Sequence, residues 1–85
     1  MKYLTLILTL LCTTVEAKSE RHHQEMYCKG EIEHRLLDRT RVDCLTETHA
    51  IEYDFARKWA EAIGQSLHYA RMTGKEAGIV IIYKG

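Results

Sequence analysis

The 85-residue chain contains no proline, only five glycines and no excess of either charge. Proline-rich and glycine-rich segments are typical of linkers and disordered regions, so their scarcity, with 46% apolar residues, indicates one small globular domain. The 12 Lys and Arg residues balance the 12 Asp and Glu residues, which excludes the broad positive surface by which many nucleic-acid-binding proteins displace counterions. Any contact with nucleic acid must therefore be local.

Several catalytic motifs are also missing. The sequence has no G-x-S-x-G nucleophile turn, no glycine-rich phosphate loop and no H-E-x-x-H zinc motif. His22 and His23 are adjacent, so they do not share a helix face, and no Cys2His2 spacing accompanies them. Hydrolysis through an activated serine or a zinc ion has no support in this sequence.

The one long apolar run lies at the start of the chain. Lys2 precedes "YLTLILTLLC", and small residues follow up to Ala17, a pattern typical of a secretory signal peptide over residues 1–17. The run is shorter than the roughly 20 apolar residues of a membrane span, and no second run follows. We expect an exported protein, periplasmic or secreted, whose mature form is a single domain over residues 18–85 with no membrane segment. The alternative is an N-terminal strand or helix that packs into the core.

Cleavage after Ala17 would leave Cys28 and Cys44 as the only cysteines. An even pair in an exported chain predicts a disulfide. A bridge that closes a loop of about 17 residues would add roughly 3 kcal/mol to the stability of a small core. Two buried thiols are the alternative.

Short periodic segments make up the remaining chain. "SERHHQEMY" favours a helix that ends before Gly30, and "EIEHRLL" favours a strand of about five residues. In "RVDCL" apolar and polar positions alternate, which predicts a half-buried strand with Val42 and Cys44 on one side. "THAIEY" predicts another strand after a short turn.

A helical period begins at Asp54, which we expect to cap the helix. Phe55 and Trp59 begin the apolar positions that recur at helical spacing until Gly74, and both are expected to anchor the core. "AGIVIIY" then predicts a strand buried on both faces and parallel to an earlier strand, because the helix supplies the crossover. The expected fold is α/β, a small mixed sheet in the order helix, three strands, helix, strand.

This order, with an acid on each of two neighbouring strands, resembles the minimal core of the PD-(D/E)XK, or restriction-endonuclease-like, nuclease superfamily over roughly residues 19–83. The resemblance implies that Asp43 in "RVDCL" and Glu52 in "HAIEYD" bind a divalent metal. The helix adds "QSLHY", which is similar to the Q-x-x-x-Y element of the RecB-like branch. Gln65 and Tyr69 are therefore candidate site residues.

The superfamily places a lysine two residues after the second acid, where this sequence has Asp54. We expect Lys58 to replace that lysine, because on an ideal helix Lys58, Gln65 and Tyr69 fall within about 40° of one another. Asp54 itself stays a secondary metal candidate besides its expected capping role. Lysines occur on this helix elsewhere in the superfamily.

The residue types suit Mg²⁺ or Mn²⁺ on chemical grounds. Mg²⁺ prefers hard oxygen ligands and keeps several waters, so two carboxylates and a substrate phosphate can complete its coordination. Asp43 and Glu52 would supply those carboxylates, and Glu25 is a candidate outer ligand through water. Each residue also has an ordinary explanation: Asp43 as an acid at a sheet edge, and Lys58, Gln65 and Tyr69 as solvated or core-rim positions on a helix.

The expected function is thus a metal-dependent nuclease that acts on DNA or RNA outside the cytoplasm. Two alternatives stay open: an exported interaction or regulatory module that keeps the fold without catalysis, and a fragment of a longer nuclease. Many small members of the superfamily dimerise, so the resemblance is also compatible with a homodimer.

Overall fold

A computed structural model describes residues 19–83. The predicted signal peptide over residues 1–17 lies outside the described residues. The described chain is a mixed α/β domain with one four-stranded sheet, a helix over residues 19–27 (the N-terminal helix) and a second, longer helix. The remaining elements are β1 (Glu31–Arg35), β2 (Arg41–Leu45), β3 (His49–Phe55), the 3-10 turn η1 (Ala56–Lys58), α2 (Trp59–Thr73) and β4 (Glu76–Ile82).

The sheet keeps the strands in sequence order, β1-β2-β3-β4. β1, β2 and β3 pair antiparallel through short turns, whereas β4 pairs parallel to β3. β4 can run parallel to β3 because α2 returns the chain to the end of the sheet at which β3 begins, as a crossover connection requires. The predicted order of elements and the predicted parallel last strand are confirmed. The prediction that this strand is buried on both faces is wrong, because β4 lies at the edge of the sheet and only Ile82 in it is buried.

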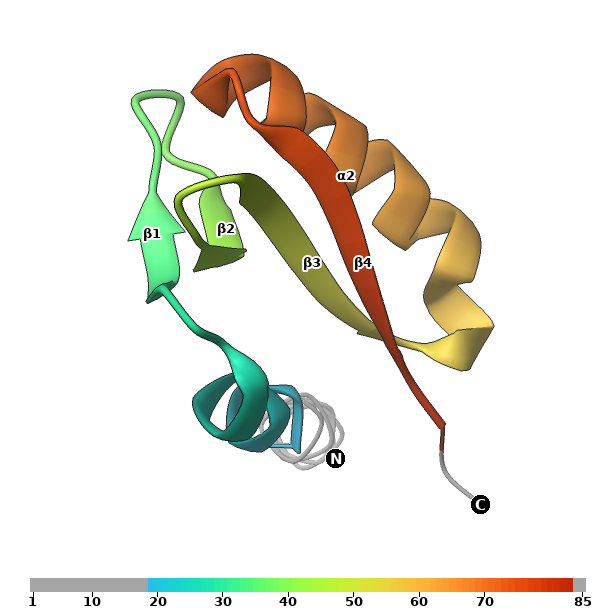
Figure 1. Ribbon diagram of the computed structural model, residues 1–85. Coiled ribbons are helices and arrows are strands. Elements are labelled where there is room, and N and C mark those ends of the chain that lie inside the picture. Colours follow the sequence, from blue (N-terminus) through green and yellow to red (C-terminus); the bar gives the residue numbers. More distant parts are fainter. Residues whose placement is uncertain (1–18, 84–85) are drawn as a thin grey trace, which may run out of the picture.

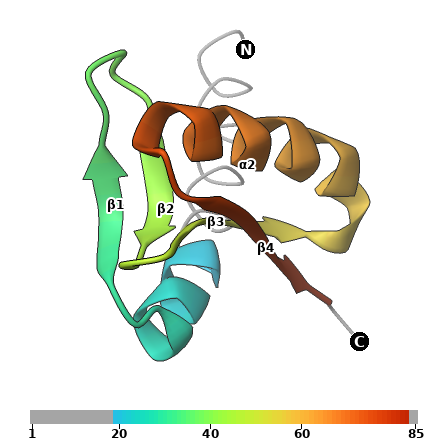
Figure 2. The same ribbon diagram turned by 45° about the horizontal axis from the view of Figure 1, so that its top comes forward.

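The two helices lie on opposite sides of the sheet. Figures 1 and 2 show α2 across β3 and β4 on one side and the N-terminal helix on the other. The face of α2 that is turned to the sheet carries Ala62, Ser66 and Tyr69, all buried. The helix ends at Gly74, whose φ of 69° is the left-handed conformation that glycine adopts without a steric penalty.

The core is small and depends on β2 and β3. Val42 and Cys44 are fully buried, so the predicted alternation along β2 is confirmed. Val42, Ala50 and Tyr69 form a buried apolar cluster, which Leu36 and Leu45 flank. A core of this size contributes little hydrophobic free energy, so covalent support matters in this domain.

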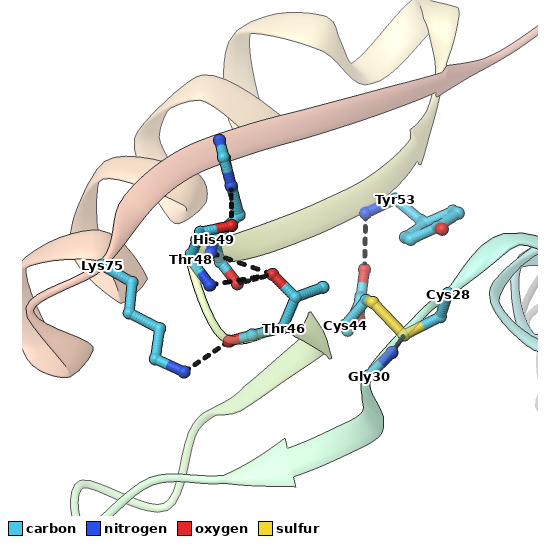
Figure 3. Close-up of a disulfide and its surroundings, with 9 residues drawn as sticks. Cys28, Gly30, Cys44, Thr46, Thr48, His49, Tyr53 and Lys75 are labelled. Carbon is cyan, nitrogen blue, oxygen red and sulfur yellow. Dashed lines mark hydrogen bonds between the residues drawn. A yellow bond between two sulfur atoms is a disulfide. The ribbon is translucent and has the colours of Figure 1, made fainter.

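That covalent support is the disulfide between Cys28 and Cys44, which confirms the predicted pairing. It joins the end of the N-terminal helix to the second half of β2, and the two cysteines are 16 positions apart in the sequence (Figure 3). Gly30 allows this close approach, because a Cβ atom there would lie 2.1 Å from the carbonyl oxygen of Leu45. The chain can therefore enter β1 beside β2 only with glycine at this position.

The start of the second helix differs from the sequence prediction. β3 continues through Asp54 to Phe55, η1 follows, and α2 begins only at Trp59. Asp54 does not cap a helix, since neither η1 nor α2 has a side-chain cap. Its carboxylate instead accepts the backbone N–H of Phe55 at 2.9 Å inside the strand. The helical pattern in the sequence therefore placed the start of the helix several residues too early, within the strand.

The two predicted aromatic anchors also separate. Phe55 is buried at 2% exposure, as expected. Trp59 is 61% exposed, so its predicted place in the core is wrong. Trp59 falls within about 20° of buried Ser66 on an ideal helix, so its exposure reflects its position as the first residue of α2 rather than the helix phase.

Candidate functional site

Asp43 and Glu52 meet where β2 and β3 separate. The two strands pair at Cys44 with Ile51 and at Leu45 with Ala50, and the next step of this register places Asp43 opposite Glu52. Here a side chain, instead of a backbone carbonyl of β2, accepts a hydrogen bond from β3. Asp43 Oδ2 accepts the backbone N–H of Tyr53 at 2.8 Å, the bond drawn at Tyr53 in Figure 3. The structure therefore brings the two predicted metal-binding acids together.

Burial and mutual repulsion dominate the electrostatics of this acid pair. Glu52 is only 6% exposed, and the loss of water raises its pKa to about 9, with further contributions from the charge of Asp43 and their shared hydrogen bond. Burial also raises the pKa of Asp43 to about 6, although the hydrogen bonds from Tyr53 and Glu52 oppose this shift. At neutral pH the pair therefore shares one proton.

Other carboxylates surround the pair. The charge of Asp54 raises the pKa of both Asp43 and Glu52, and Glu33 of β1 adds to the effect on Asp43. Asp54 is itself buried at 6% exposure. The charges that shift the pKa values of the pair most are all carboxylates. The site is thus a buried group of acids in which a positive charge would lower the free energy.

A buried acceptor at the pair has no donor among residues 19–83. Glu52 Oε1 is buried without a hydrogen-bond partner there, and so is Oε1 of Gln24 on the N-terminal helix, a residue only 1% exposed. Leaving a buried acceptor unsatisfied costs roughly 1–3 kcal/mol, so such atoms are uncommon in folded proteins. Glu52 Oε1 is chemically suited to a bound cation or to a proton donor from a ligand.

Tyr69 reaches the pair from α2. It is 7% exposed, and burial, followed by the charges of Glu52 and Asp43, raises the pKa of its phenol to about 12. The phenol therefore keeps its proton at neutral pH and is an O–H donor near the acids. Tyr69 is the predicted helix residue that the structure places most clearly at the site.

The other two predicted helix residues are placed less directly. Gln65 is half-buried and lies one turn before Tyr69 on the same face of α2. Lys58 belongs to η1 and takes a non-helical backbone conformation just before α2, so the helical arc predicted for it does not apply. It is half-buried beside the end of β3.

The N-terminal helix contributes a different acid from the predicted one. Glu25 is exposed and forms an ion pair with Arg21 at 3.1 Å. The charge that acts on Glu52 is that of Glu20, which lies one helical turn before Gln24 on the same face. Sequence reasoning missed Glu20 and Gln24, although their spacing of four residues on a predicted helix was a usable signal. Glu52 therefore lies between groups from both helices.

Within residues 19–83, no group of three or more His, Cys, Asp or Glu side chains has the geometry of a metal site. The described helices include none long and apolar enough to cross a membrane. No protein-family model, no curated protein and no solved structure matches this chain. Its function must therefore be argued from the acid pair and its surroundings.

Proposed function

We propose that the protein is a metal-dependent nuclease with a restriction-endonuclease-like core, which hydrolyses phosphodiester bonds of DNA or RNA. One observation supports this most: a half-buried carboxyl group, Asp43, and a buried one, Glu52, face each other on adjacent strands, and Glu52 has an unsatisfied oxygen. A pair of acids with raised pKa values reduces stability, and such groups are concentrated at functional sites. The oxidised cysteine pair is consistent with export.

The donor set fits Mg²⁺ or Mn²⁺. Asp43 and Glu52 offer hard carboxylate oxygens, and two protein carboxylates are enough for an ion that keeps its remaining ligands as water and substrate phosphate. This fit is compatible with the lack of a three-ligand cluster in the described chain. A divalent ion would also replace the proton that the pair now shares, because it stabilises both carboxylates in their charged form.

Each residue then has a distinct role. When bound, the ion would polarise a phosphate oxygen and lower the pKa of a water molecule. Asp43 and Glu52 hold it, with Asp43 oriented by the N–H of Tyr53. Tyr69 donates a hydrogen bond toward the phosphate, Gln65 assists in orienting it, and Lys58 stabilises the negative charge that develops in the transition state. Asp54 and Glu20 are candidates for outer contacts through water.

Cleavage by variants of the acid pair tests this function. Wild-type protein with Mg²⁺ or Mn²⁺ should cleave DNA or RNA, and Glu52→Gln and Asp43→Asn should each abolish cleavage, because each removes a ligand charge with little change in volume. Either ion at a hundred times its dissociation constant should add about 2.7 kcal/mol to the unfolding free energy, which the variants should lose. Glu25→Gln is the matched control, since it neutralises an exposed acid.

Lys58→Ala separates binding from catalysis. It should lower the cleavage rate by a large factor and leave the metal-induced stabilisation unchanged, as expected for a group that acts mainly on the transition state. Equal activity of wild type and Lys58→Ala would remove this residue from the proposed site. Absence of both cleavage and metal-induced stabilisation in the wild type would rule out the nuclease function.

A second candidate is a non-catalytic interaction module. It is favoured by an apolar stripe on α2, where Trp59, Ile63 and Leu67 follow one another at helical spacing and are 61%, 42% and 61% exposed. Exposed apolar surface of this kind is typical of contact regions between proteins. A module of this kind requires no divalent ion, so the metal-induced stabilisation distinguishes the two candidates.

A further inference from the structure

A hollow lies at the end of β3, away from the acid pair. It has a volume of about 200 Å³ and is lined by Phe55, Ala56, Arg57 and Tyr83. Sites for drug-sized ligands usually span about 300–1,000 Å³, so this hollow suits a single flat ring system. The proposed roles of Asp43, Glu52 and Tyr69 do not involve it.

The walls of the hollow are aromatic and cationic. The guanidinium carbon of Arg57 lies 5.2 Å from the centre of the Phe55 ring, a cation–π distance that positions the Arg57 head at the hollow. Phe55 is buried, whereas Tyr83 is 80% exposed although it lines the same hollow. An exposed ring beside a fixed guanidinium is the arrangement on which unpaired bases stack.

The position along β3 relates the hollow to the acid pair. Glu52 is in register with Ile79 of β4. Phe55 is in register with Ile82, so Tyr83 is the next residue beyond the paired end of β4. Tyr83 follows Ile79 by four residues, which is about 13 Å along a strand and an even spacing, as for residues on one face of a sheet. About 13 Å corresponds to a few nucleotides at ~3.4 Å per step, so one strand of nucleic acid can reach from Glu52 to Tyr83.

Charge favours a nucleotide over an apolar peptide. Arg57 and Lys58 are consecutive, and the residues that line the hollow include no acid. Arg57 is the one charged residue among the described residues that line the hollow. A ring attached to a phosphate matches an aromatic wall beside a guanidinium, whereas an aliphatic side chain would use only the aromatic wall.

We infer that this hollow binds an unpaired nucleobase of the substrate and that the substrate is single-stranded nucleic acid; this assignment rests on the proposed nuclease function. Base pairing buries the faces and edges of a base in a duplex, so only a single strand presents a base to the hollow at no cost of unstacking. Tyr83 and Arg57 therefore determine substrate type, whereas Asp43 and Glu52 determine cleavage.

Fluorescence anisotropy tests the assignment with a short fluorescein-labelled oligothymidylate in buffer with EDTA, where no cleavage occurs. Wild-type protein should bind it, Tyr83→Ala should weaken binding about tenfold, and Tyr83→Phe should bind like the wild type because it keeps the ring. Arg57→Ala should also weaken binding. Tyr27→Ala is the matched control, since Tyr27 is a similarly exposed tyrosine on the N-terminal helix and should have no effect.

Three outcomes would overturn the assignment: no binding by the wild type, equal binding by Tyr83→Ala and wild type, or equal binding of the single strand and its duplex. An unchanged thermal midpoint in Tyr83→Ala, expected because Tyr83 is exposed and lies outside β4, shows that any loss is local. Cleavage that depends on Asp43 while binding does not depend on Tyr83 would reject only this assignment. Binding that depends on Tyr83 without metal-dependent cleavage would reject only the nuclease function.

Discussion

Asp38, in the turn before β2, and the acid pair of Asp43 and Glu52 experience opposite environments. Asp38 lies in the turn between β1 and β2, where Oδ1 accepts the N–H and O–H of Thr40 and Oδ2 bonds His68 of α2 at 2.8 Å. The hydrogen bonds from Thr40, followed by that from His68, lower the pKa of Asp38 to about 2. This carboxylate is charged, hydrated and supplied with donors.

The acid pair of Asp43 and Glu52 has the reverse balance. Burial is the main cause of the raised pKa of both groups, and only the bonds from Tyr53 and Glu52 to Asp43 oppose it. The two regions belong to the same small sheet, so the difference comes from donors and water rather than from the type of residue. The turn uses its carboxylate to hold α2 against the β1–β2 turn, whereas the pair lowers the stability of the fold and is explained best by a ligand.

The disulfide should give the largest effect of a single change, because it joins the N-terminal helix to β2, the strand that carries Asp43. Cys28→Ala combined with Cys44→Ala should lower the unfolding free energy by about 3 kcal/mol, as the opened loop gains chain entropy in the unfolded state. Urea unfolding of the oxidised, reduced and double-alanine forms measures this. Equal urea midpoints for the oxidised and reduced forms would show that the disulfide does not stabilise the fold around the acid pair.

The acid pair should make stability depend on pH, and for each pH unit this effect is smaller than the loss of the disulfide. Glu52 has a pKa of about 9 in the folded protein against 4.5 for the unperturbed group, so between these values the folded state binds a proton that the unfolded state releases. Stability without divalent ions should therefore fall as pH rises from about 5 to 9, by up to about 1.4 kcal/mol per pH unit.

Denaturant unfolding of Glu52→Gln across this pH range checks that expectation. The variant cannot release the proton, so its stability should change much less with pH and should exceed that of the wild type at pH 8. Glu25→Gln should keep the pH dependence of the wild type, because Glu25 is exposed. A wild-type stability that rises between pH 5 and 8 would contradict the buried, protonated state of Glu52.

The Asp38 turn should give the smallest effect. The pKa of Asp38 is lowered from 3.8 to about 2, so its contribution to stability is present above pH 3.8 and is lost as pH falls through 2. Asp38→Asn should lower the thermal midpoint slightly at pH 7 and make progressively less difference toward pH 2. Differential scanning calorimetry at pH 7 and pH 3 measures both. A larger penalty at pH 3 than at pH 7 would reverse the assigned sign.

Local patterns predicted the order of elements well, and they predicted the boundary between β3 and α2 poorly. The alternation in "RVDCL" and the branched run "GIVII" depend on near neighbours, and both became strands. β3 continues to Phe55 because Phe55 pairs with Ile82, a partner distant in sequence, and no local signal contains that pairing. A residue type that often caps helices, such as Asp54, is weak evidence for the start of a helix when the same segment can pair with a parallel strand.

The candidate site likewise has parts that could be predicted from the sequence and parts that could not. Asp43 and Glu52 could be predicted to meet, because one acid on each of two adjacent strands needs only the correct register. The identity of the acid on the N-terminal helix depends on helix phase and on docking through the disulfide, so Glu25 was predicted where Glu20 acts. The raised pKa of Glu52 depends on burial by both helices, which a single sequence does not contain.

The parallel pairing of β3 with β4 also has a consequence for how the chain folds. β1, β2 and β3 can associate through short turns, but β3 acquires its second neighbour only after α2 has crossed over and β4 has docked. Contacts between segments far apart in sequence generally form late, since the chain must first close a large loop. Glu52 and Asp54 lie in the stretch of β3 that β4 covers, so their removal from water belongs to that closing step. The least favourable solvation change of the domain therefore falls at the end of folding, when most favourable contacts already exist.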